Sequence, residues 1–230
     1  REALEAGAVG VSTTTFEGHN GADGAPMPSR LADEREMRAL ARTLREAGKG
    51  SFLASLGSDH PVFGGREPMA FLESMAAESG RPGIASGIVH VPSMPESCFA
   101  EMDAVAVAQS RGRRVYAQVS CSAITLIFTL ATPFPFEGLR TWQPAFPLYE
   151  DHAALAALYD DPDFREAVKK DLIVPGSAKL FTDQWDRMVI EEAARDEYRH
   201  LRGRDVASLA AVEGVHPFDW FLDFGIAEDF

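Results

Sequence analysis

The first half of the chain repeats one order of segments: a short apolar strand, a loop with Gly, Pro or Ser, an amphipathic helix, and a Gly before the next strand. This order predicts four strands, at residues 8–13, 50–55, 83–90 and 114–119, and helices at 31–47, 68–79 and 96–111. Successive strands begin about 30–45 residues apart, which leaves room for a crossover helix. Strands joined in this way are parallel, with right-handed connections.

The helix expected at 31–47 has the clearest pattern. Its apolar side chains recur at helical spacing on one stripe, which comprises Leu31, Met37, Leu40, Ala41 and Leu44. In "SRLADERE", either Ser29 or Asp33 could cap the open amides of the first turn. We therefore expect this helix to cover one face of the sheet with its apolar stripe.

After residue 119 the repeated order lapses. Residues 120–148 contain several prolines and large apolar side chains without a clean period, which is typical of an inserted loop region that packs over one end of a sheet. Residues 149–230 read as a helix-rich continuation, with helices at 151–158, 163–171, 205–213 and 217–224 and a strand at 187–190. We expect residues 1–230 to form a single α/β domain, with βα repeats in 1–119.

Composition excludes several classes of protein. A hydrophobic content of 46% fits a chain with a sizeable core, and the net charge of −13 disfavours duplex nucleic acid and anionic membrane surfaces as partners. No apolar run approaches the roughly 20 residues that span a bilayer. Cys98 and Cys121 give no disulfide framework, so we expect two small buried hydrophobes in a cytoplasmic protein. Because the chain starts at Arg1 and stops straight after an apolar helix, we expect it to be an interior piece of a longer protein.

Short catalytic motifs are missing from the sequence: it has no His-x-His, His-Glu-x-x-His, Cys-x-x-Cys, Walker loop or Gly-x-Ser-x-Gly. Position is the remaining guide, because parallel α/β folds bind ligands at the carboxyl ends of their strands. The polar residues at or just beyond the predicted strand ends are Thr13, Thr14, His19, Ser55, His90, Gln118 and Ser120. We take these as substrate-pocket candidates, although hydroxyl groups in such places also cap helices and loops.

Among these candidates, His90 in "GIVHVPS" is the strongest, because it ends a strand before a proline-bearing loop. His19 and His60 lie in loops rich in Gly, Asn and Asp, where a solvated side chain is the simpler expectation. The long loop that follows the first strand, residues 14–30, is expected to form one rim of an active site.

Several segments, taken in order, resemble one known family. They are "REALEAGAVGVSTTT", "DGAPMPSRLADEREMRALARTLREAGKG", "MAAESGRPG", "RGRRVYAQVS", "LYDDPDFREAVKKDL" and "GRDVASLAAVEGVHPFDWFLDFGIAEDF". Together they are similar to amidohydrolase family 3, the group of N-acyl-D-amino-acid deacylases and D-aminoacylases, over nearly the whole chain. The strand and helix pattern alone leaves an open doubly wound sheet and a barrel equally possible. The resemblance implies a partial (β/α)8 TIM barrel of the metal-dependent amidohydrolase type, with a long insertion after the fourth strand.

The resemblance also implies a cofactor, zinc or another divalent metal, in the intact parent protein. The family's His-x-His would precede Arg1, and its catalytic aspartate would follow Phe230, so the fragment alone is expected to be inactive. Two further family histidines correspond to Ser55 and Gly87 here, and His90 is then the one candidate metal ligand within this chain.

Three hypotheses about function follow. The first is an amidohydrolase that cleaves the amide-type C–N bond of a small molecule such as an N-acyl amino acid, with residues 123–136 as an apolar wall for the acyl chain. The second is a non-catalytic TIM-barrel binding or assembly module that has lost its metal ligands. The third is metal-independent hydrolysis by Ser120 as nucleophile with His90 as base. Because a half-barrel would expose sheet edges and apolar surface, we expect this chain either to form a homodimer through those edges or to close in a rearranged way.

Overall fold

The computed structural model describes residues 1–21, 24–57, 60–91, 94–174 and 180–230. These residues form two compact units: unit 1 contains Arg1–Gly21 and Ala25–Ile124, and unit 2 contains Gly24 and the described part of Thr125–Phe230. Each unit has its own cluster of buried apolar side chains. The sequence led us to expect one α/β domain over 1–230, with changes of character after residues 119 and 148. The structure instead divides the chain after Ile124.

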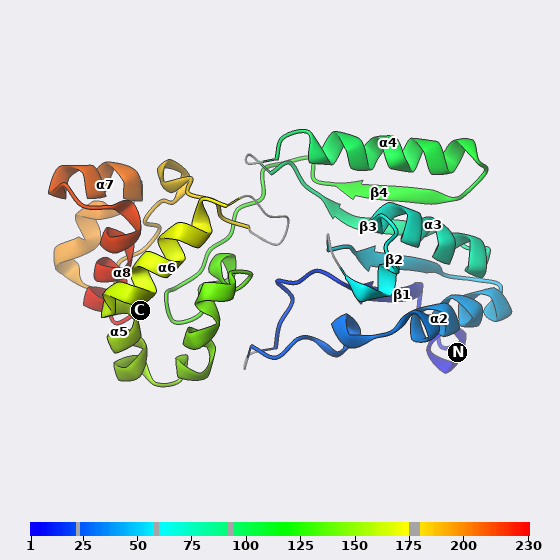
Figure 1. Cartoon of the computed structure of the whole chain (residues 1–230), viewed down its shortest axis with the longest axis horizontal. Helices are drawn as coiled ribbons and strands as arrows, with labels where there is room; N and C mark the ends of the chain where they lie inside the picture. Colours follow the sequence, from blue (N-terminus) through cyan, green and yellow to red (C-terminus); the bar gives the residue numbers. More distant parts are fainter. Residues whose placement is uncertain (22–23, 58–59, 92–93, 175–179) are drawn as a thin grey trace. The chain divides into compact units, whose positions relative to one another are not determined.

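Unit 1 is built on a parallel sheet in which the strand order follows the sequence order, β1-β2-β3-β4 (Figure 1). The strands are β1 Gly10–Thr14, β2 Ser51–Ser55, β3 Gly83–Ile88 and β4 Val115–Val119. The short helix α1 Glu2–Glu5 precedes β1, and α2 Glu34–Ala47, α3 Pro68–Ser79 and α4 Ser97–Ser110 connect successive strands. The predicted α/β class and the parallel strands are therefore confirmed.

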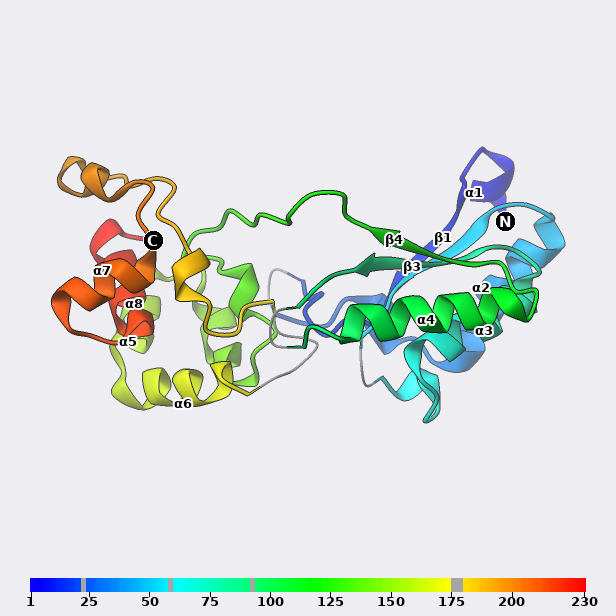
Figure 2. The same cartoon turned by 90° about the horizontal axis from the view of Figure 1, so that it is seen from above.

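Helices α2, α3 and α4 all lie on one face of the four strands (Figure 2). Side chains alternate accordingly: Phe52 and Ala54 of β2 are fully buried under the helices, whereas the intervening Leu53 is only partly covered. Thr13 also belongs to the covered face, because its hydroxyl lies 3.8 Å from the sulfur of Met37 in α2. The opposite face carries partly covered or exposed side chains in all four strands, and we call it the open face: Ser12, Leu53, Ile84 and Tyr116.

Local signals explain where the helices of unit 1 begin and end. Asp33 caps α2 by accepting a hydrogen bond from the Glu36 amide at 2.9 Å. Leu31, which the sequence pattern placed in this helix, belongs instead to the preceding 3-10 helix η1 Pro28–Leu31 and is exposed. Helix α3 occupies the predicted range 68–79, with Pro68 in its first turn and Gly80 after it at φ +62°.

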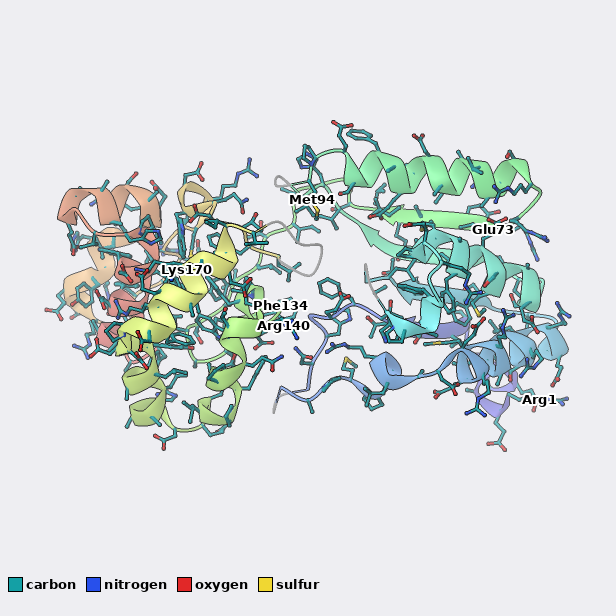
Figure 3. The ribbon with its side chains drawn as sticks, viewed as in Figure 1. Arg1, Glu73, Met94, Phe134, Arg140 and Lys170 are labelled. Atoms are coloured by element: carbon teal, nitrogen blue, oxygen red, sulfur yellow. The ribbon has the colours of Figure 1, made fainter. Side chains whose placement is uncertain are left out.

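Ion pairs link the helices of this layer. Glu73 of α3, labelled in Figure 3, pairs with Arg111 just beyond α4 at 3.0 Å. Arg38 of α2 pairs with Glu78 of α3, also at 3.0 Å. Such partly exposed pairs contribute little energy each, so the packing of the apolar stripes holds this layer together.

Unit 2 is helical. It contains α5 His152–Asp160, α6 Pro162–Leu172, α7 Val206–Glu213 and α8 Pro217–Glu228, with the 3-10 helices η3 Phe134–Phe136, η4 Arg140–Leu148, η5 Trp185–Arg187 and η6 Asp196–Leu201. The four α-helices confirm the helices predicted in this region. The strand expected at 187–190 is wrong, because the segment begins in η5 and Val189 makes only an isolated bridge with Asp205.

The core of unit 2 is aromatic. Phe136 and Trp142 are fully buried, and their ring centroids lie 5.0 Å apart. Both residues come from the segment 120–148, which we expected to be an insertion over one end of the sheet. The segment instead supplies the core of a separate unit, and Phe136 of the proposed acyl-chain wall is packed inside that core.

Two further expectations concern single residues and membrane spans. Cys121 is exposed and Cys98 is only half-buried, so the expectation of two buried cysteines is wrong. No helix in the described part of the chain combines the length and apolar character needed to cross a bilayer.

Candidate functional site

The carboxyl ends of β1 and β2 are joined by a network of threonine hydroxyls. Thr14 pairs in register with Ser55, and the carbonyl of Ser55 accepts a hydrogen bond from the Thr15 amide at 2.9 Å. The Thr15 hydroxyl in turn accepts from the Gly57 amide at 3.0 Å. Thr14 belongs to the open face by alternation, yet only 6% of it is exposed. The loop that follows β1 is what covers it.

His19 is the residue of that loop that contacts Thr14. Its Nδ1 lies 2.7 Å from the Thr14 hydroxyl, which also accepts a hydrogen bond from the Phe16 amide at 3.1 Å. The ring of Phe16 packs edge-on against the imidazole at 5.1 Å between centroids. Burial, and secondly the charge of Arg30, lower the pKa of His19 from its ordinary value, so the ring is neutral at pH 7.

Arg30 closes this loop from the other side. Its Nη1 donates to the carbonyl of His19 at 3.2 Å and also to the Asn20 side chain. The backbone reinforces the closure, since the Met27 amide donates to the same carbonyl at 3.3 Å. His19 is therefore held at both ends, by Thr14 through its ring and by Arg30 through its backbone.

His60 connects the loop after β2 to the same arginine. Its Nδ1 accepts from the Val62 amide at 3.1 Å at the start of the 3-10 helix η2 Pro61–Phe63, and its Nε2 lies in hydrogen-bonding distance of the Arg30 carbonyl. These two bonds fix the tautomer with the proton on Nε2. The expectation of a solvated His60 is thus wrong. A hollow of about 330 Å³ lies beside it, lined by residues 30–34 and 60–62.

Two buried polar atoms at this edge have no hydrogen-bond partner in the described part of the chain: Arg30 Nε and Glu17 Oε2. Among the described residues, no carboxylate forms an ion pair with Arg30. The Glu17 carboxylate packs on Gly57, where a Cβ would come within 2.6 Å of Oε2. Sequence reasoning missed Thr15, Glu17 and Arg30, because it considered only strand-end hydroxyls and histidines.

The remaining candidates are arranged differently. Gln118 follows Ala117, which pairs with Ala85 on the covered face, so alternation places the exposed Gln118 on the open face with Ser55. Thr13 lies on the opposite, helix-covered face. His90 lies two residues beyond the end of β3 and is exposed, although the strand does contain a bulge between Ala85 and Ile88.

Ser120 is exposed as well, and its hydroxyl donates to the carbonyl of Ser122 at 2.6 Å. Among the described residues it makes no hydrogen bond with His90, so the geometry of a serine nucleophile with a histidine base is not formed. The structure therefore brings Thr14, His19 and Ser55 together, and His90 and Ser120 make no hydrogen bond to them among the described residues.

The described residues do not by themselves fit a metal site, because no three of their His, Cys, Asp and Glu side chains gather closely enough to hold an ion. Comparison of the chain with protein-family models, with curated proteins and with solved structures found no significant match.

Proposed function

We propose that this chain is part of an amidohydrolase that cleaves the amide C–N bond of an N-acyl amino acid or a related amide. The carboxyl edge of the sheet then forms one wall of its substrate pocket. The observation that carries this proposal is the contact between Thr14 and His19 beside Ser55, at the edge of the sheet where parallel α/β enzymes bind their ligands. The sequence resemblance to the N-acyl-D-amino-acid deacylases supplies the reaction class.

The arrangement of the sheet supports a partial (β/α)8 barrel as the framework. In a doubly wound sheet, the strand order reverses at a switch point and helices cover both faces. In unit 1, the order β1-β2-β3-β4 runs without reversal, and α2, α3 and α4 share one face. In a barrel, the open face with Thr14, Ser55 and Gln118 would be the interior, and its carboxyl end would be the mouth of the active site.

The pocket wall offers hydrogen-bonding groups that are not used within the described structure. The Ser55 hydroxyl and the Gln118 side-chain amide make no hydrogen bond to a described residue. Both groups are able to donate to a carbonyl oxygen and to accept from an amide N–H. We propose that they orient the scissile amide, while Thr14 holds His19 in place.

The resemblance implies a metal ion, and the described residues do not supply its ligands. We therefore assign no step of the reaction to a metal held by this chain. In the proposed function, this chain's residues bind and orient the substrate and exclude water from it. The groups that attack the carbonyl belong to other parts of the natural protein.

The test is the release of free amino acid from N-acetyl amino acids of both configurations by the natural protein that contains this chain. We expect turnover that Ser55→Ala lowers by at least about tenfold, as expected for the loss of a substrate hydrogen bond. Ser110→Ala is the matched control, because this exposed serine bonds only within α4. Absence of turnover with retained substrate binding would instead favour the non-catalytic binding module.

A further inference from the structure

We infer that the loop between β1 and α2 holds a subsite for a carboxylate group, with Arg30 as its cation and His19 as its second hydrogen-bond donor. This inference deepens the proposed function and rests on it for the rest of the substrate. The binding itself can be measured without any reaction.

Arg30 is the cation of the proposed subsite. Its guanidinium donates through Nη1 to the His19 carbonyl and the Asn20 side chain, so the loop holds the group by one nitrogen. Its Nε is buried and bonds to no residue that the structure describes. A buried guanidinium N–H without an acceptor is destabilising, and a carboxylate oxygen is the acceptor that the geometry of this group favours.

His19 is the second hydrogen-bond donor of the proposed subsite. The Thr14 hydroxyl has one hydrogen and two acceptors within reach: His19 Nδ1 at 2.7 Å and the Ser55 carbonyl at 3.4 Å. Assigning the hydroxyl hydrogen to the shorter contact makes Nδ1 an acceptor and leaves the proton of the neutral ring on Nε2. Nε2–H has no partner among the described residues. His19 thus presents an unused donor.

Arg30 also differs from other arginines of unit 1 in the charges around it. The chain carries a net charge of −13, and the partly buried Arg38 and Arg66 of unit 1 are paired with Glu34. Arg30 is without such a partner among the described residues. Of the acidic side chains of the same loop that are described, Glu17 packs on Gly57, and Asp33 caps α2 and pairs with Arg35. A cation that no described carboxylate pairs with, beside an N–H donor that no described residue uses, is suited to an anionic ligand.

The test titrates this chain with N-acetyl-D-methionine and, separately, with the neutral N-acetyl-D-methioninamide, followed by backbone and imidazole NMR signals. We expect the acid to shift the signals of His19, Asn20 and Arg30 and to bind at least about tenfold more tightly than the amide. Equal binding of acid and amide would overturn the inference. So would a preference for inorganic phosphate over the acid, because the site would then not be a carboxylate site.

Variants at Arg30 and His19 test which side chains bind the acid. Arg30→Met should weaken binding of the acid by about tenfold or more, and Arg30→Lys by less, because it keeps the charge and loses the planar fork. Arg35→Met is the control, since this arginine is 93% exposed and pairs only with Asp33. If Arg30→Met disturbs the fold, His19→Phe, which removes the side-chain donor, replaces it. Unchanged affinity in the variants would overturn the inference.

The two proposals fail in different ways. Carboxylate binding at this loop, without hydrolysis by the natural protein, would overturn the proposed function and leave the subsite intact. Hydrolysis of N-acetyl amino acids with a KM that Arg30→Met does not change would support the proposed function and overturn the subsite.

Discussion

The hydroxyl of Thr14, the last residue of β1, and Nδ1 of His19, five residues later in the loop, lie 2.7 Å apart. This contact anchors the loop to the open face of the sheet and fixes the orientation of the imidazole. Because Arg30 holds the His19 backbone from the other side, His19 is fixed in place before any ligand binds. A site with this degree of preorganisation loses little conformational entropy on binding.

The anchoring contact should have a measurable effect on stability. Thr14→Val removes the hydroxyl that serves both the His19 ring and the Phe16 amide, and we expect the free energy of unfolding to fall by about 1–3 kcal/mol, since the partners remain partly buried. Chemical denaturation provides the measurement. Ser120→Ala is the control, with an expected change within about 0.5 kcal/mol, because this exposed hydroxyl bonds only to its own turn. A similar effect of the two substitutions would contradict the anchoring role.

The pKa of His19 predicts a pH dependence of stability. Burial first, and the charge of Arg30 second, lower this pKa in the folded state. In the unfolded state, the imidazole binds its proton near the ordinary pKa of about 6.5, so at acidic pH the unfolded chain binds more protons. Stability is therefore fully present above that value and falls as the pH drops through it towards the lowered folded pKa.

The measurement is the free energy of unfolding of the wild type and of His19→Gln between about pH 8 and about pH 5. The stability difference between the wild type and the variant should shift in favour of the variant as the pH falls, because glutamine does not titrate. An NMR titration of the His19 ring gives the folded pKa directly. A difference that stays constant across this range would contradict the assignment.

Separate cores predict separate local stabilities. Phe71 and Phe136 are both fully buried, the first in unit 1 and the second in unit 2. Replacing either one by alanine should cost about 3–5 kcal/mol. Amide hydrogen exchange should then accelerate mainly in the unit that carries the substitution. Equal loss of protection in both units from one substitution would show a single cooperative core.

The exposed edge of the sheet predicts self-association. Strand β4 ends the described sheet, and its side chains Tyr116 and Val119 are 47% and 61% exposed. We propose that this chain forms a homodimer through such edges, and that lysine at both positions weakens it. Light scattering measures the mass, and Val212→Lys, at an exposed apolar site in unit 2, is the control. A monomeric mass of the wild type at high protein concentration would rule out the homodimer.

Much of the fold was predictable because its signals are local. Helix α3 was predicted over its whole range because a proline opens it and a left-handed glycine follows it. The start of α2 was predicted three residues too early, since Leu31 fits the helical stripe but the Asp33 cap decides where the helix begins. Segment 120–148 was misread because apolar residues without a period do not reveal which core they join.

The candidate site was harder to predict than the fold, because part of it depends on contacts between residues that are distant in the sequence. Strand ends identified Thr14 and Ser55, whose position depends only on the alternation of the strands. The role of Arg30 depends on hydrogen bonds to a carbonyl 11 residues away, which no sequence period records. His60 looked solvated because its loop is polar, yet both of its ring nitrogens are bonded to backbone groups.

The central claim is that ligands bind at the carboxyl edge of β1 and β2. Chemical-shift mapping of this chain with N-acetyl-D-methionine tests that claim most directly. Shifts confined to residues around Thr14, His19, Arg30, Ser55 and Gln118 are the predicted result. Shifts that fall instead on the helices of unit 2, or on the helix-covered face of the sheet around Thr13, would contradict it.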